Sequence, residues 1–127
     1  MKLIALAPIL LTIVAGQAVA ADVSGVWRLK ADVDGFKFEL ECKLNQLMGG
    51  KVTGVCTDLA TNDPQHKPQG SHTLTMGKVE GDRVTIAYKT HFLLMPFTAA
   101  YSGVLNGDTI KGEAKAPGHT GTFSATR

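Results

Sequence analysis

Residues 36–45 read FKFELECKLN, and this stretch decides the fold of the chain. Apolar side chains or cysteine occupy every second position, and lysine or glutamate fills the positions between them. Such period-two alternation is typical of a β-strand with one face in the core and one in water, because successive side chains of a strand point to opposite faces. The side chains expected to face inward are Phe36, Phe38, Leu40, Cys42 and Leu44.

Glycine, often beside Asp or Asn, recurs along the rest of the chain in patterns typical of hairpin turns. Cutting the chain at these turns predicts eight strands, at 25–32, 36–45, 51–59, 71–79, 83–91, 97–105, 109–115 and 121–127. No segment after the N-terminal twenty residues predicts a helix. We expect an all-β fold, an antiparallel up-and-down meander closed into a small barrel, because closure removes exposed strand edges. A two-sheet β-sandwich is the alternative.

Two cysteines test this register. Folding the second and third strands about Gly49 places Cys42 directly opposite Cys56. Paired cysteines in that position are close enough to form a disulfide. The competing interpretation, a metal site, needs more ligands than the sequence places nearby, so we expect a disulfide, no metal and no cofactor.

The first twenty residues have the pattern of a cleavable signal peptide. Lys2 precedes an apolar run from Leu3 to about Val14, and Ala18 and Ala20 provide a small-residue cleavage site. We therefore expect residues 1–20 to be removed and residues 21–127 to form a single β-barrel domain that is exported, periplasmic or secreted. No membrane span is expected after cleavage.

The charge pattern disfavours nucleic acid as a partner. The chain has 13 Lys and Arg against 11 Asp and Glu, and they are not clustered. Binding to a polyanion requires a concentrated basic surface. We therefore expect neither nucleic acid nor an anionic membrane as a partner.

Gly25-Val26-Trp27 opens the first predicted strand, and Arg127 ends the last one. Both features resemble the calycins, the group of lipocalins, fatty-acid-binding proteins and avidins, which carry a G-x-W on the first strand and a basic residue on the last. The resemblance implies a barrel closed at one end by Trp27 and Arg127, through stacking and cation–π attraction. It also implies a ligand inside the barrel. The chain departs from the group in being short and in lacking a predicted lid or plug helix.

An apolar segment, Phe92 to Phe97, lies where a polar turn is expected. It either fills one barrel end, or forms the lip of a ligand portal, or provides an exposed patch for a protein partner. The candidate ligand-binding residues are Phe92, Leu94, Phe97, Tyr88, Tyr101 and His91.

Residue size decides whether the barrel is hollow. The expected inward set includes Leu74, Met76, Val84, Ile86, Ile110 and Phe123, with smaller places at Gly54, Ala100, Gly103, Gly112 and Ala114. The small residues either leave a cavity or mark kinks at barrel corners.

No catalytic motif stands out. Glu39 and Glu41 lie on the expected water face, and no nucleophile-elbow sequence surrounds a serine. His72 and His91 are candidates to share a ligand or a weakly bound metal at a barrel mouth. The leading hypothesis is an exported binding module for a small apolar or aromatic molecule. The alternatives are a protein-interaction or protease-inhibitor-like module that uses residues 92–97, and a barrel enzyme of cyclase or isomerase type with Tyr88, Tyr101 or a mouth histidine as proton donor.

Overall fold

The computed structural model describes residues 22–64, 67, 70–92 and 94–127, and of Phe92 the backbone only. The expected signal peptide and its cleavage site lie outside these residues.

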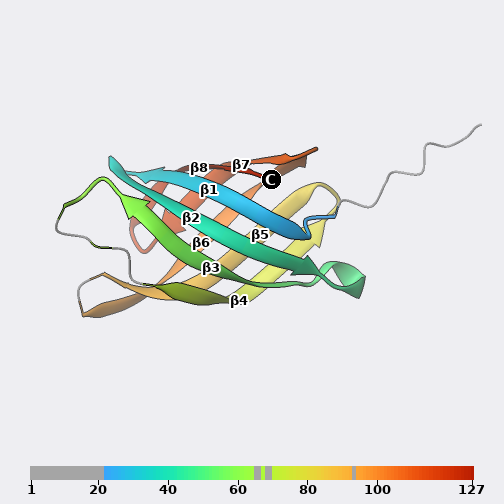
Figure 1. Cartoon of the computed structure of the whole chain (residues 1–127), viewed down its shortest axis with the longest axis horizontal. Helices are drawn as coiled ribbons and strands as arrows, with labels where there is room; N and C mark the ends of the chain where they lie inside the picture. The colour runs from blue at the N-terminus through green and yellow to red at the C-terminus, as the bar shows by residue number, and fades with distance from the viewer. Residues whose placement is uncertain (1–21, 65–66, 68–69, 93) are drawn as a thin grey trace, which may run out of the picture.

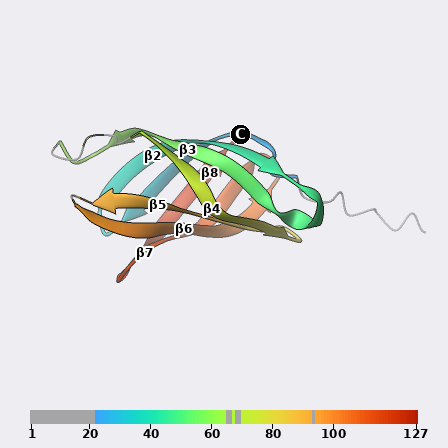
Figure 2. The same ribbon diagram turned by 90° about the horizontal axis from the view of Figure 1, so that it is seen from below.

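Eight antiparallel strands pair in chain order, and β1 pairs with β8, so the sheet is a closed barrel (Figures 1 and 2). This confirms the predicted meander and rejects the sandwich. The strands are β1 (Gly25–Val33), β2 (Phe36–Gln46), β3 (Val52–Thr61), β4 (Ser71–Glu80), β5 (Arg83–Phe92), β6 (Met95–Asn106), β7 (Thr109–Ala116) and β8 (His119–Thr126), and a short 3₁₀ turn η1 (Met48–Gly50) joins β2 to β3.

The connections alternate between the two ends of the barrel. The β1–β2, β3–β4, β5–β6 and β7–β8 connections lie at one end, which we call the mouth end, on the left in Figure 1. η1 and the β4–β5 and β6–β7 turns lie at the other, the closed end. The β1–β2 turn has both central residues, Asp34 and Gly35, at positive φ (54° and 83°). This is the conformation that an Asp-Gly hairpin turn adopts readily.

Trp27 and Arg127 close one end of the barrel. Trp27 is 1% exposed, and its indole Nε1 donates to the carbonyl oxygen of Val23 at 2.9 Å. The guanidinium carbon of Arg127 lies 4.5 Å from the centre of the Trp27 ring. The structure therefore contains the contact that the calycin resemblance implied.

Cys42 pairs with Cys56 across β2 and β3, and the two form a disulfide with Cα atoms 4.0 Å apart. The predicted bridge is confirmed. Both cysteines are buried, so the bridge lies on the inner face of the barrel.

Two register shifts alter the inside–outside pattern. One lies in the β2–β3 ladder beside Leu59, and the other lies in β4 between Leu74 and Met76. A bulge inserts one residue into a strand, so side chains beyond it change face. Met76, expected inside, is 47% exposed for this reason.

The small residues of β6 and β7 serve close strand contact. Gly103 pairs with Gly112, and a Cβ at Gly112 would lie 2.0 Å from the carbonyl oxygen of Ser102. These glycines therefore let the two backbones approach. On β6 the buried alanine is Ala99, whereas Ala100 is only partly buried, so the expected inward position of Ala100 was one residue off.

The apolar segment forms a tight hairpin tip. Phe92 pairs with Met95 and His91 pairs with Pro96, so β6 begins at Met95, two residues before its predicted start. Pro96 therefore lies inside β6, whereas the predicted strand began one residue later, at residue 97.

Candidate functional site

A cavity of about 660 Å³ occupies the mouth end of the barrel. Its walls come from the strand ends and from three mouth connections, which contribute Asp34, Lys67 and Pro117. The lining residues are Val33, Asp34, Phe36, Phe38, Asp58, Thr61, Lys67, Tyr88, Thr90, His91, Met95, Pro96, Phe97, Ala99, Tyr101, Ala114, Lys115, Ala116, Pro117 and His119. Its volume falls within the range of small-molecule sites.

Aromatic rings form much of the inner wall. Phe36 and Phe38 lie at alternate positions of β2, with ring centres 5.6 Å apart. Phe38 meets Tyr101 edge to face at 6.5 Å, and Tyr101 meets Phe123 in the same manner at 5.4 Å. Such edge contacts hold rings in fixed orientations. The wall is therefore a preformed apolar surface.

Tyr88 and Tyr101 place two phenols together inside the barrel. Both face inward from β5 and β6, and their hydroxyl oxygens lie 2.7 Å apart. Burial raises the pKa of Tyr88, and the nearby charge of Asp58 raises it further against the opposing hydrogen bond. Burial likewise raises the pKa of Tyr101, helped by Tyr88 and Asp58. Both phenols therefore remain protonated well beyond neutral pH.

Asp58 and His72 form a pair behind the tyrosines. The carboxylate Oδ2 of Asp58 and Nε2 of His72 lie 2.9 Å apart, with side chains 19% and 9% exposed. The His72 ring stacks on Tyr88, with ring centres 4.9 Å apart and planes 12° apart. Asp58 reaches the cavity, so this pair brings a carboxylate to an otherwise mostly apolar wall.

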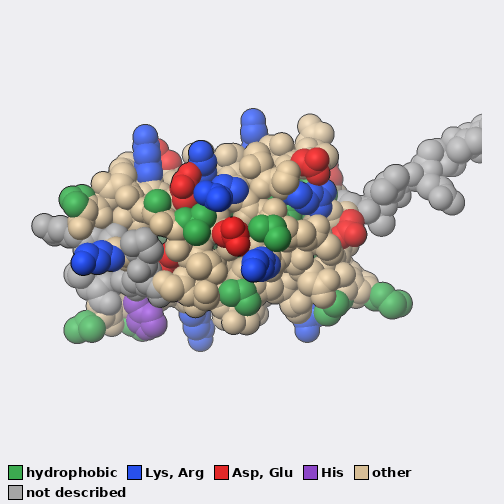
Figure 3. All heavy atoms as spheres, viewed as in Figure 1, with side chains coloured by type: hydrophobic (Ala, Val, Ile, Leu, Met, Phe, Trp, Pro, Cys, Tyr) green, Lys and Arg blue, Asp and Glu red, His purple; other side chains and the backbone are tan. Residues whose placement is uncertain are grey.

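Charged and polar side chains surround the mouth. Lys67 and Lys115 line the cavity at this end, and so does His91. Nδ1 of His119 hydrogen-bonds Oδ2 of Asp34 and thereby joins the β7–β8 connection to the β1–β2 turn. Figure 3 shows one face of the molecule, where charges of both signs are interspersed and hydrophobic side chains are mostly isolated.

The structure brings together four of the six predicted ligand-binding residues. Tyr88, Tyr101, Phe97 and His91 all line the cavity. Leu94 does not line it, since its side chain is 95% exposed at the hairpin tip. The side chain of Phe92 lies outside the described part of the structure.

Asp58 was not among the predicted site residues, and the grouping of His72 with His91 differs from the structure. Asp58 lies two positions after the inward-facing Cys56, so period two already placed its carboxylate inside the barrel. His72 and His91 were candidates to share a ligand or a weakly bound metal. Instead His72 stacks behind Tyr88 while His91 is exposed.

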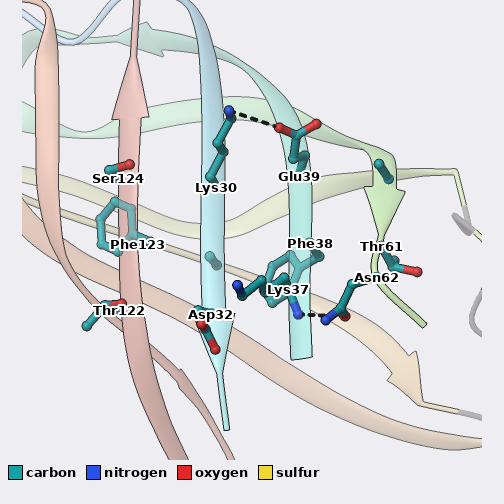
Figure 4. Close-up of a pocket in the computed structure, with 12 residues that line it drawn as sticks. Lys30, Asp32, Lys37, Phe38, Glu39, Thr61, Asn62, Thr122, Phe123 and Ser124 are labelled. Atoms are coloured by element: carbon teal, nitrogen blue, oxygen red, sulfur yellow. Dashed lines mark hydrogen bonds and ion pairs between the residues drawn. The ribbon is translucent and has the colours of Figure 1, made fainter. Parts of the chain in front are cut away.

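A second hollow, of about 460 Å³, lies on the outer surface of β8, β1, β2 and the end of β3 (Figure 4). Lys30 and Glu39 form an ion pair at 3.3 Å along it, and the amide of Lys37 donates to Asn62 Oδ1 at 2.9 Å. Its charged side chains are occupied with one another or exposed to solvent. We therefore take the interior cavity as the candidate site.

Within the described ranges, no group of three or more His, Cys, Asp or Glu side chains is placed to hold a metal ion. The same residues contain no helix that is both long and apolar enough to span a membrane. Comparison with protein-family models and with curated proteins finds no match to this chain.

Proposed function

We propose that this chain is an exported, calycin-like binding module that holds a small apolar or aromatic molecule in the mouth-end cavity. The observation that carries the proposal is the 660 Å³ cavity lined by Phe36, Phe38, Phe97, Tyr88 and Tyr101. An eight-stranded barrel is wide enough to hold one small ligand, and in this barrel such a space lies at the mouth end.

Three further features support it. Trp27 and Arg127 close one end in the manner that the calycin resemblance implies. The Cys42–Cys56 disulfide suits an oxidising compartment, and disulfides are rare in the cytosol. Apolar ligand pockets with a few polar groups are the usual form of small-molecule sites, and Asp58 and the tyrosine pair provide such groups here.

Native mass spectrometry of protein purified from an exporting host tests the proposal. We expect a fraction of the molecules to carry a small non-covalent adduct that organic extraction removes. The stripped protein should then bind naphthalene in a fluorescence titration. Protein without an adduct that shows neither binding nor a thermal shift with naphthalene and other aromatic or lipid probes would contradict the proposal.

A second candidate function, protein contact through residues 92–97, is favoured by the exposure of the hairpin tip. Leu94 is 95% exposed and Met95 is 72% exposed. A photo-crosslinker at position 94 should capture one discrete partner from the host's periplasmic extract. The matched control is the same crosslinker at Met48, which is 99% exposed at the opposite end. Equal or absent capture at both sites would reject this candidate.

A further inference from the structure

The tyrosine pair carries one hydrogen that the protein does not use. Two phenols have two hydroxyl hydrogens, and the bond between Tyr88 and Tyr101 uses one of them. Among the described residues neither hydroxyl has another hydrogen-bonding partner. Both tyrosines line the cavity, where a polar group without a partner is costly. A ligand atom that accepts a hydrogen bond would satisfy the spare hydrogen.

Asp58 restricts which acceptor can come close. Its carboxylate lies near enough to both phenols to raise their pKa values electrostatically. An anionic ligand group at the same place would face like-charge repulsion in a poorly solvated site. Oδ2 of Asp58 already lies 2.9 Å from Nε2 of His72, so this carboxylate has a partner within the protein and does not require a cationic ligand. These charges favour an uncharged acceptor.

The remaining walls suit a flat apolar body. Phe36, Phe38 and Phe97 line the cavity together with Ala99 and Ala114, whose small side chains leave room between the rings. Aromatic rings pack well against such surfaces in edge or offset arrangements. The cavity thus combines apolar walls with one buried hydrogen-bond donor.

We propose that the ligand is a neutral aromatic or cyclic carbonyl compound whose carbonyl oxygen accepts a hydrogen bond from the Tyr88–Tyr101 pair. This inference rests on the proposed binding function and adds the chemical class of the ligand. At the tyrosine pair it distinguishes the site from one for fatty acids or other carboxylates, whose charged group would face Asp58 there, whereas Lys67 and Lys115 lie at the mouth.

Four probes that share one ring system test the inference: naphthalene, acetylnaphthalene, naphthoate and naphthylmethylammonium. Affinities are measured by fluorescence titration of the full mature chain at neutral pH. We expect acetylnaphthalene to bind about five- to ten-fold more tightly than naphthalene, as one added neutral hydrogen bond implies. Naphthoate should bind more weakly than acetylnaphthalene. Tightest binding by the ammonium or the carboxylate probe would overturn the inference.

The double variant Y88F/Y101F identifies the donor. Both hydroxyls must be removed, because either phenol alone retains a donor hydrogen. We expect the preference for acetylnaphthalene over naphthalene to fall to about one while naphthalene binding persists. The matched control is Thr98→Val, which removes a hydroxyl from the exposed face of β6, outside the cavity lining, and should leave the preference intact. A preference that survives the double substitution would overturn the inference.

Infrared spectroscopy provides a measurement that needs no variant. The carbonyl stretch of bound acetylnaphthalene should shift to lower frequency than in an apolar solvent, because a donated hydrogen bond weakens the carbonyl bond. An unshifted band would refute carbonyl recognition. If naphthalene itself does not bind, the proposed function fails. If naphthalene binds but acetylnaphthalene has no advantage, only this inference fails.

Discussion

At the scale of single residues, Arg127 makes more contacts than its surface position suggests. Besides lying over Trp27, its Nη1 donates to the carbonyl oxygens of Asp22 at 2.7 Å and Ser24 at 3.1 Å. Its Nε donates to Asp108 Oδ1 at 3.0 Å, and Nη2 donates to the Gly107 carbonyl oxygen at 3.1 Å. One side chain thus ties the start of β1 to the β6–β7 turn.

Replacing this residue, as Arg127→Ala, should lower the free energy of unfolding by about 2 kcal/mol, from the lost cation–π contact and charge-assisted hydrogen bonds. Urea unfolding followed by tryptophan fluorescence measures it, since Trp27 is the only tryptophan in the chain. The control is Arg28→Ala on the exposed face of β1, which should cost less than about 0.5 kcal/mol. Equal losses in the two variants would contradict the assignment.

The two buried phenols should make the free energy of unfolding decrease as the pH rises into the alkaline range. Burial raises the pKa of both Tyr88 and Tyr101 above the usual 10.0, so the folded state holds protons that the unfolded chain releases. Their contribution is therefore fully present below about pH 10 and is lost as the pH rises through the folded-state values.

We expect the wild-type melting temperature to fall above pH 10 more steeply than that of Y88F/Y101F. Phenolate absorbance tests the same point, because the chain has only two tyrosines. The absorbance should appear only as the barrel unfolds. Full ionisation of the native protein near pH 10 would show that the pair is not shielded.

Filling the cavity should separate binding from stability. Ala99 is buried on β6 and lines the cavity, so Ala99→Phe would occupy ligand space. We expect naphthalene affinity to fall at least about ten-fold, while the free energy of unfolding changes by less than about 1.5 kcal/mol. Ala60→Phe, at an exposed position on the outer surface, is the control and should leave binding unchanged. Undiminished binding by Ala99→Phe would place the ligand elsewhere.

At the scale of elements, the β2–β3 hairpin is held by the Cys42–Cys56 bridge, with a sequence separation of 14. Closing such a loop limits the unfolded chain, which in the chain-entropy model is worth about 3 kcal/mol. We expect reduction to lower the free energy of unfolding by that amount. Chemical unfolding with and without a phosphine reductant measures it.

Alkylation of the native protein is the accompanying check. Both cysteines should resist a thiol reagent until they are reduced, because no free thiol is present among the described residues. Labelling without reduction, or equal stability before and after it, would contradict the predicted contribution.

The strand pattern was predictable wherever side chains alternate without interruption. The alternation from Phe36 to Leu44 predicted β2, its inward face and its pairing with β3. These three features depend only on the period-two pattern and on one glycine turn. Met76 and Ala100 were misplaced. A bulge shifts Met76 by one position although Thr73 to Met76 alternate, whereas Ala100 follows Ala99 in a segment without a clear alternation of polar and apolar residues. Local pattern does not reveal where one strand gains a residue over its neighbour.

The hairpin tip shows a related limit. Residues 92–97 are apolar throughout, so their composition does not separate a filled barrel end from an exposed turn. The pairing of Phe92 with Met95 makes this segment part of the β5–β6 hairpin, and the side chain of Leu94 is exposed to solvent. The direction of these side chains follows from β5–β6 pairing and not from hydrophobicity.

At the scale of the whole molecule, neighbouring strands of the barrel pair over unequal lengths. β5 and β6 pair from Arg83–Val104 to Phe92–Met95, whereas β3 and β4 pair regularly only from Val55–Thr73 to Thr57–Ser71. One further bridge joins Lys51 to Lys78. We expect backbone amides of β4 to exchange with deuterium faster than those of β6, because fewer ladder hydrogen bonds must open.

Hydrogen exchange followed by mass spectrometry of peptides from the two strands measures the difference. Binding of naphthalene should slow exchange in β5 and β6, which contribute Tyr88, Phe97 and Tyr101 to the cavity. Peptides from the closed end of β1 serve as the internal control and should not change. Uniform protection of β4 and β6 would contradict the expected weakness.

The residues of the site could be predicted where they lie on regular strands, but their contacts across strands could not. The aromatic members were accessible from the sequence, since Tyr88, Tyr101 and Phe97 lie on strands with a recognisable inward face. The meeting of the two phenols was not, because it requires the diagonal offset between β5 and β6. The Asp58–His72 pair likewise depends on the short β3–β4 ladder, which no local pattern reports.

The barrel is complete only when β1 pairs with β8. Arg28 to Asp32 pair with Thr126 to Thr122, so the ring of strand-to-strand hydrogen bonds closes between the first and last strands. Until then β1 and β7 each present an unpaired edge, the form of β-structure most prone to intermolecular association. A chain in which β8 has not yet docked is therefore open to association through both of these edges. A chain that lost β8 would keep the edges of β1 and β7 unpaired permanently.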